Sequence, residues 1–113
     1  MISLVVAAGF VMIDPGHFHA SLVQNRFYPD VSPVVKVFAP DGAELDAHLK
    51  FVESFNGRKD NPTAWTEDVY RGPDFLAEFS SAARKKAMGE NPIVILAGKN
   101  NRKGEYALAA VEA

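Results

Sequence analysis

Four short apolar runs alternate with segments of helical periodicity along this chain, and the alternation constrains its fold more than any other feature. The runs, at residues 10–13, 34–38, 66–70 and 93–97, are predicted strands. Parallel strands need crossover connections, and a helix in each connection covers a face of the sheet. The sequence therefore predicts an α/β, Rossmann-like domain with three αβα layers and a mainly parallel sheet of about four strands, in the order 3-2-1-4.

The connections carry the apolar residues that such helices need. Leu45, Leu49 and Val52 fall on one face of a helix predicted over residues 41–56. The third run mixes polar and apolar residues, which predicts a strand at the sheet edge. The fourth run is almost wholly apolar, which predicts a strand covered on both faces. Further helices are predicted from residue 18 to about 25, over residues 73–88, and over residues 102–112.

Composition limits the partners and the location. The 113 residues suffice for one domain, residues 1–113, with a core of its own, and the lack of cysteine excludes disulfides and thiolate metal sites. Twelve basic and 14 acidic residues without a basic stripe argue against a nucleic-acid partner, and no run is long enough to span a membrane. Residues 1–8 are apolar but lack a positively charged start, so they are predicted to be a lead-in strand or a trimmed export signal. The expected location is cytoplasmic, or exported on the second interpretation.

The turn after the first run is a candidate nucleotide cradle. A strand, a sharp turn at residues 14–16 and a helix start follow one another, and the N–H groups of such a helix start can hold a phosphate. Gly16 would let a ligand approach the backbone closely. The dinucleotide fingerprint G-x-G-x-x-G keeps only this middle glycine, with Asp14 at its first and His19 at its third position. The predicted cofactor-binding residues of this turn are Asp14, Pro15, Gly16, His17, Phe18 and His19.

The loop after the fourth run is the other half of the predicted site, because the strand order places it opposite the turn. Ala97, Gly98, Asn100 and Asn101 are its candidate cofactor-binding residues, and the two asparagines are alternatively caps of the last helix. A ribose-binding acid is expected near the end of the second strand. Asp41 is the nearest candidate, slightly late.

Three stretches resemble the glucose-fructose oxidoreductase / inositol dehydrogenase (Gfo/Idh/MocA) family. Residues 95–113, ILAGKNNRKGEYALAAVEA, look like its fourth strand-helix unit. Residues 14–20, DPGHFHA, and residues 55–65, FNGRKDNPTAW, resemble a divergent branch that lacks the glycine motif. The resemblance covers essentially the whole chain. It implies the NAD- or NADP-binding amino-terminal part of an oxidoreductase that acts on a sugar or polyol.

The sequence also departs from that family. The family's catalytic lysine lies in a Glu-Lys-Pro motif on a fifth strand, and this sequence stops before such a strand, so the resemblance assigns no catalytic residue here. Nor is the family's substrate domain present. Loss of two fingerprint glycines weighs against tight pyrophosphate binding, because a side chain at His19 crowds the helix against the sheet.

Two other functions compete with this interpretation. Asp14, His17 and His19, with His48 as a further candidate, are metal-ligand types, and the letters IDPGH resemble zinc-dependent cell-wall amidases, which together suggest a metal-dependent hydrolase. Against it, side chains two positions apart on a helix diverge by about 200°. The second competitor is a non-catalytic interaction domain. His48 is otherwise predicted to be a solvated or half-buried helix residue, and His17 and His19 are either ligand contacts or packing residues.

The fourth run lacks a predicted outer neighbour. An apolar strand whose row of N–H and C=O groups is open is a template for pairing. The sequence therefore predicts either a homo-oligomer formed through this edge or an edge covered by residues 1–8.

Overall fold

The chain folds around a parallel sheet, as the sequence predicts. The computed structural model describes residues 8–85, 91–98 and 102–112, apart from the side chains of Phe18 and Lys103. The strand order is β3-β2-β1-β4, and every pairing is parallel. The strands are β1 Gly9–Ile13, β2 Val34–Ala39, β3 Thr66–Arg71 and β4 Pro92–Ile95.

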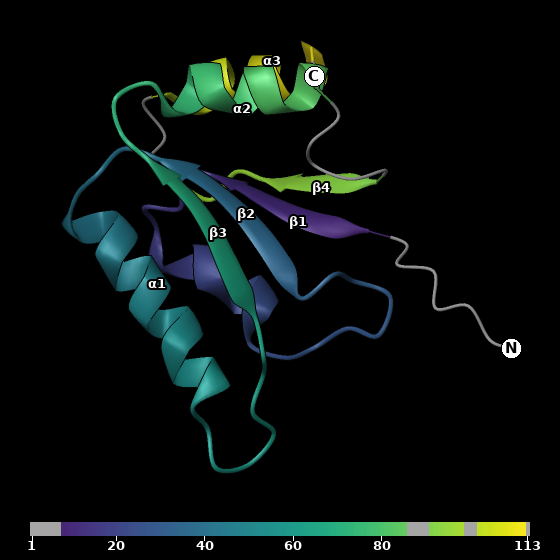
Figure 1. The fold of residues 1–113 in the computed structure, drawn as a ribbon. Coiled ribbons are helices and arrows are strands. Elements are labelled where there is room, and N and C mark those ends of the chain that lie inside the picture. Colours follow the sequence, from purple (N-terminus) through teal and green to yellow (C-terminus); the bar gives the residue numbers. More distant parts are fainter. Residues whose placement is uncertain (1–7, 86–90, 99–101, 113) are drawn as a thin grey trace, which may run out of the picture.

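Helices cover both faces of the sheet, which makes the three predicted layers (Figure 1). On one face lie η1 Phe18–Gln24 and α1 Ala43–Asn56, and on the other lie α2 Phe75–Arg84 and α3 Lys103–Glu112. The register pairs Ile13 with Phe38 and Met12 with Ile95. The loops that follow β1, β2 and β4 therefore all leave the sheet at the carboxyl ends of the strands. This end of the sheet is called the carboxyl edge below, in distinction from the outer strands β3 and β4. None of the described helices is both long enough and apolar enough to cross a membrane.

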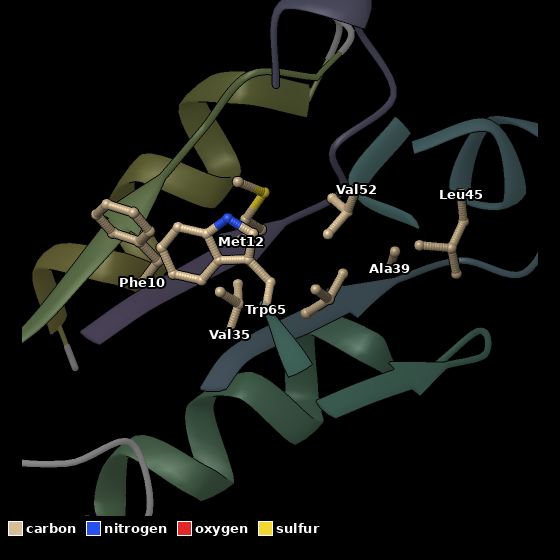
Figure 2. Close-up of a cluster of buried hydrophobic side chains, with 8 residues drawn as sticks. Phe10, Met12, Val35, Ala39, Leu45, Val52 and Trp65 are labelled. Atoms are coloured by element: carbon tan, nitrogen blue, oxygen red, sulfur yellow. The ribbon is translucent and has the colours of Figure 1, made fainter. Parts of the chain in front are cut away.

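Each face of the sheet has its own apolar cluster. Toward η1 and α1, Trp65 packs with Phe10 and Val35, and Figure 2 shows the indole lying over the strands. Leu45 and Val52 of the predicted α1 stripe are buried in this cluster, and Leu49 packs against it. Toward α2 and α3, the buried residues are Val11, Ile13, Phe38, Phe75, Phe79 and Tyr106.

Two elements differ in detail from the predictions. The predicted helix after β1 is present as a 3-10 helix. Hydrogen bonds hold both ends of this segment: the His17 N–H donates to the Ala97 carbonyl, and the Gln24 carbonyl accepts from the Trp65 indole N–H. Seven residues span about 14 Å as a 3-10 helix but only about 10.5 Å as an α-helix, so the longer 3-10 form reaches both partners. β4 is covered only in part: Ile95 packs against the cluster toward η1 and α1 and Val94 against the cluster on the other face, whereas Ile93 is 46% exposed.

The other element predictions agree with the structure. β3 lies at the sheet edge, as its mixed composition predicted. The predicted extension of α2 beyond Lys85 falls on residues 86–90, which are outside the described residues. The lead-in strand predicted for residues 1–8 is described only at Ala8, which forms an isolated parallel bridge with Val31.

Candidate functional site

The turn after β1 is held in an unusual backbone conformation by Asp14. Its φ angle is 49°, in the left-handed region that favours glycine and that aspartate tolerates better than most residues. Its N–H donates to the Phe38 carbonyl at 2.8 Å, and its own carbonyl accepts from the Gly16 N–H at 2.7 Å. Asp14 thus adopts the backbone conformation that the first fingerprint glycine usually supplies, with a carboxylate added.

That carboxylate is anchored from α3. The Tyr106 hydroxyl donates to Asp14 Oδ2 at 2.7 Å. Burial, with the hydrogen bond to Asp14 as a second cause, raises the pKa of Tyr106 to about 12, so the hydroxyl keeps its proton at neutral pH. Gly98 backs the same turn, and a Cβ there would collide with the Asp14 carbonyl. The loop after β4 therefore packs directly on the turn after β1, as the strand order predicted.

The cradle residues themselves are closely packed. The His17 N–H donates to the Ala97 carbonyl at 3.1 Å, and His17 Nδ1 accepts from the His19 N–H at 3.2 Å. A Cβ on Gly16 would lie 2.6 Å from Glu44 Oε2 of α1. The lack of a side chain at Gly16 thus leaves room for the flexible Glu44 side chain beside the turn.

These contacts bring part of the predicted site together. Asp14, Gly16 and His17 lie beside Ala97 and Gly98, whereas Asn100 and Asn101, including their predicted cap role, fall outside the described residues, as does the Phe18 side chain. Cofactor binding by any of them stays a prediction.

A cavity of about 300 Å³ opens at the carboxyl edge between β1 and β2. It is lined by Asp14, Pro15 and residues 39–45, so it includes the predicted ribose acid, Asp41, and also Glu44. None of its lining residues is lysine or arginine. Arg71 of β3 lies close by, 3.4 Å from Asp41 and 2.6 Å from Asp46. The lining of the first cavity is therefore acidic, and the neighbouring Arg71 is already paired.

A second cavity, of about 250 Å³, lies between the turn and the outer part of α1. Its walls are residues 15–17 on one side and Ala43, Glu44, Ala47, His48 and Phe51 of α1 on the other. The two cavities share Pro15, Ala43 and Glu44. Helix α1 therefore contributes to both.

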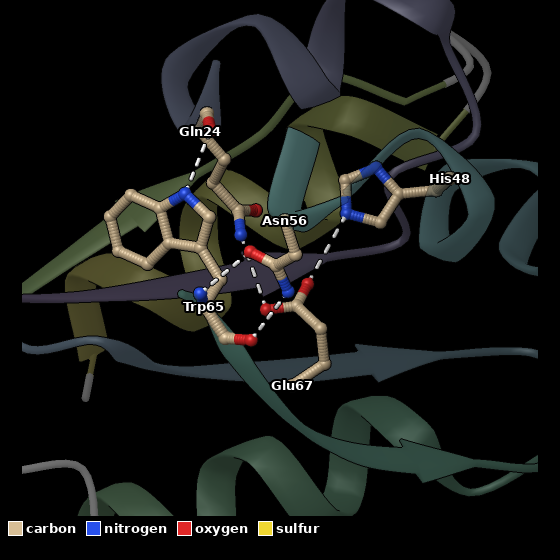
Figure 3. A network of polar contacts seen from close by, with 5 residues as sticks. All are labelled: Gln24, His48, Asn56, Trp65 and Glu67. Carbon is tan, nitrogen blue, oxygen red and sulfur yellow. Dashed lines mark hydrogen bonds and ion pairs between the residues drawn. The ribbon is translucent and has the colours of Figure 1, made fainter. Parts of the chain in front are cut away.

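A network of polar contacts links Gln24, His48, Asn56, Trp65 and Glu67 and uses the 55–65 motif (Figure 3). Asn56 Oδ1 accepts from the Trp65 N–H at 2.8 Å and from the Thr63 hydroxyl at 2.7 Å, while Asn56 Nδ2 donates to the Trp65 carbonyl. The Trp65 indole N–H donates to the Gln24 carbonyl at 2.7 Å. Residues 55–65, one of the three stretches that resemble the family, thus form structural hydrogen bonds. These bonds connect the start of β3 to η1 and to the end of α1.

His48 and Glu67 complete the network, and the prediction of a solvated or half-buried His48 is wrong. Its side chain is 2% exposed because α1 turns it toward the sheet, where Nε2 lies 3.9 Å from Glu67 Oε1. Burial lowers the pKa of His48 to about 4. Burial also raises the pKa of Glu67 to about 7, against the opposing effect of a hydrogen bond from Gln24. Both groups are thus shifted toward their uncharged forms, as expected when desolvation outweighs attraction.

Sequence reasoning did not single out Glu44, Glu67 or Tyr106. A signal for Glu67 was present, because residues 65, 67 and 69 alternate onto one face of a strand, and the first and last of them are apolar. Tyr106 is the one residue with a polar aromatic side chain in the last predicted helix. For Glu44 no sequence signal distinguishes it from an ordinary acid in a first helical turn.

The metal-hydrolase hypothesis finds no support in the described residues, because no group of three or more histidine, aspartate or glutamate side chains among them is placed to hold a metal ion. The predicted divergence of His17 and His19 is wrong. Their ring centroids lie 4.5 Å apart. His17 is the N-cap residue of η1 and has an extended backbone conformation. The divergence of about 200° expected within a helix therefore does not apply to the side chains of His17 and His19.

Comparisons with known proteins agree with the fold. No protein-family model matches the chain, and neither does any curated protein. A solved structure from Parabacteroides merdae ATCC 43184, described as "a putative oxidoreductase", is 43% identical in sequence, with a TM-score of 0.85. The match covers 98% of this chain and 24% of that one. This chain therefore spans about a quarter of the length of that structure and shares its Rossmann-like αβα architecture.

Proposed function

We propose that this chain is the nicotinamide-dinucleotide-binding part of an oxidoreductase of the Gfo/Idh/MocA type, which acts on a sugar or polyol. The observation that carries the proposal is the likeness, at 43% identity over 98% of the chain, to a structure described as "a putative oxidoreductase". The position of the first cavity supports it. In open parallel sheets, ligands bind at the carboxyl ends of the strands, and this cavity lies at those ends of β1 and β2, beside the reversal of strand order between β1 and β4.

The residues at the carboxyl edge fit the ribose half of a dinucleotide well. Asp41 lines the first cavity at the end of β2. From there its carboxylate would accept hydrogen bonds from a ribose diol. Because Asp14, Asp41 and Glu44 line the cavity and Arg71 is paired with Asp41 and Asp46, a ribose 2′-phosphate would meet mainly negative charge. Of NAD(H) and NADP(H), the site therefore favours NAD(H).

The pyrophosphate half fits less well, because the N–H groups of Gly16, His17 and His19 already donate to Asp14, Ala97 and His17. It would lie against Gly16, where the Glu44 carboxylate now approaches, so that flexible side chain must turn away. The bound cofactor would supply hydride-transfer chemistry. The chain's own residues would position it, through the Asp14 turn that Tyr106 and Gly98 hold in place.

Calorimetric titration with NAD⁺, NADH and NADP⁺ tests the proposal. We expect saturable binding of NAD⁺ and NADH, and at least about tenfold weaker binding of NADP⁺. Gly16→Val should abolish binding, because its branched side chain fills the cradle. Gly9→Val is the matched control, since Gly9 begins β1 at the opposite end of that strand and a Cβ there meets only Ser32 at 3.9 Å. Equal affinities for the two variants, or no binding by the unmodified chain, would contradict the proposal.

We also propose that the chain self-associates through β4. Among the described strands β4 pairs only with β1, and Ile93 is 46% exposed. Sedimentation of the chain and of Ile93→Lys should show an oligomer for the first and a monomer for the second, because an edge charge blocks strand pairing. A monomer in both cases at high concentration would exclude association through this edge.

A further inference from the structure

The bare side of Gly16, where other residues have a side chain, faces a carboxylate of α1. A Cβ at Gly16 would lie 2.6 Å from Glu44 Oε2 and 3.7 Å from Asp14 Oδ1. A fingerprint glycine lets the backbone approach a pyrophosphate because no Cβ stands between them. The Glu44 carboxylate therefore lies on the side of Gly16 from which the phosphates of a dinucleotide would approach.

Glu44 also lies where the two cavities meet. It belongs to the first turn of α1 and lines both cavities. The other two residues that the cavities share are Pro15 and Ala43, whose side chains are short. Glu44 is exposed, and its side chain is long and rich in rotamers, so it can turn between Gly16 and solvent. Its orientation thus determines how much of the space beside Gly16 a ligand can enter.

The described lining of the cavities does little to offset the charge of Glu44. Neither cavity has a lysine or an arginine among its described lining residues, and Asp41 adds a further carboxylate to the first. The N–H groups of Gly16 and His17 already donate to the carbonyls of Asp14 and Ala97. Phosphates placed against Gly16 would therefore meet like charge. A nucleoside without phosphates, whose ribose reaches Asp41, would escape this repulsion.

We propose that Glu44 is an internal competitor of the cofactor's pyrophosphate. Its carboxylate holds the position beside Gly16 and lowers the affinity of this site for ligands that contain phosphates. The affinity for the nucleoside part alone does not depend on it. Glu44 thereby sets how tightly the cofactor is held, a role that rests on the proposed dinucleotide function.

Titration calorimetry with adenosine, ADP and NAD⁺ tests this role. Glu44→Gln removes the charge and keeps the size of the side chain. We expect adenosine to bind the unmodified chain and Glu44→Gln equally. ADP and NAD⁺ should bind Glu44→Gln about tenfold more tightly, and the gain should be larger for ADP because ADP has more negative charge.

Glu53→Gln is the matched control. Glu53 is exposed on the same helix and lines neither cavity, so its substitution makes the same change in net charge at another position. This variant should bind all three ligands as the unmodified chain does. A similar gain for ADP in both variants would assign the effect to net charge and overturn the role of Glu44.

Salt dependence distinguishes repulsion from a structural effect of the substitution. Salt screens the interaction between exposed charges, so the advantage of Glu44→Gln for ADP should shrink between about 50 mM and about 500 mM sodium chloride. An advantage that is the same at both concentrations would contradict the competition.

The three ligands separate the possible failures. Equal ADP affinities of Glu44→Gln and the unmodified chain, with adenosine still bound, would overturn the role of Glu44 and leave the proposed dinucleotide function standing. No binding of any of the three ligands to either chain would overturn both.

Discussion

The two faces of the sheet are held by different chemistry. Toward α2 and α3 the contacts are mainly apolar and aromatic, with edge-to-face pairs between Phe38 and Phe79 and between Phe75 and Tyr106. Toward η1 and α1 an apolar cluster surrounds the polar network of Asn56, Trp65 and Gln24. Apolar burial is non-directional, whereas hydrogen bonds fix orientation. The candidate cavities border the face with directional contacts, where α1 must be placed accurately.

The largest loss of stability is expected from a substitution in the cluster toward α2 and α3, called the aromatic face below. Phe79→Ala should lower the free energy of unfolding by about 3–5 kcal/mol, because it empties a fully buried position against Phe38. Urea denaturation measures the loss. Leu108→Ala on α3, where the side chain is 58% exposed, should change stability by less than about 0.5 kcal/mol. A comparable loss at both positions would show that the α2 and α3 layer is not packed as described.

The next largest loss of stability is expected on the face toward η1 and α1, called the polar face below. Asn56→Ala leaves the Trp65 N–H and the Thr63 hydroxyl without their partner and should cost about 2–3 kcal/mol. Asn25→Ala, at an exposed position, is the control and should be nearly neutral. Fluorescence of Trp65, the single tryptophan, should report the loosened loop in the first variant only. A neutral Asn56→Ala would mean that apolar packing alone positions this face.

The buried pair of His48 and Glu67 should give opposing effects on stability of about 2 kcal/mol each between pH 5 and 6.5. The lowered pKa of His48, about 4, makes stability rise with pH between about 4 and 6.5, because the unfolded chain binds the extra proton. The raised pKa of Glu67, about 7, makes stability fall with pH between about 4.5 and 7, because there the folded chain binds it. The two slopes nearly cancel in the unmodified chain.

Single substitutions should expose these slopes. Relative to the unmodified chain, Glu67→Gln should gain about 2 kcal/mol of stability from pH 5 to 6.5, and His48→Phe should lose about as much over the same range. Urea denaturation at several pH values provides the measurement. Slopes of the same sign in both variants would be incompatible with the pair.

The smallest expected effect lies where the two faces meet. Tyr106→Phe removes the hydrogen bond from the aromatic face to Asp14 and should cost about 1 kcal/mol. Because Asp14 holds the left-handed turn, NAD⁺ affinity should fall more than stability does. Tyr70→Phe on β3, where the side chain is 36% exposed, is the matched control. Unchanged NAD⁺ affinity in Tyr106→Phe would remove Tyr106 from the positioning of the cradle.

The fold was predictable from local sequence pattern, because each strand and each apolar helix face is formed by residues that lie close together in the sequence. The stripe of Leu45, Leu49 and Val52 and the order β3-β2-β1-β4 follow from spacing and the rules for parallel crossovers. The juxtaposition of Asp14 with Gly98 follows from that order, since the carboxyl ends of parallel strands meet at one edge.

The tertiary structure alone decided what depends on distant partners. The 3-10 form of η1 reflects anchors at Ala97 and Trp65. The burial of His48, and hence the lowered pKa of its ring, depends on how α1 rotates against β3 and its Glu67. Sequence periodicity sets which residues can share a face, but protonation states and cavities depend on long-range packing, which no local pattern encodes.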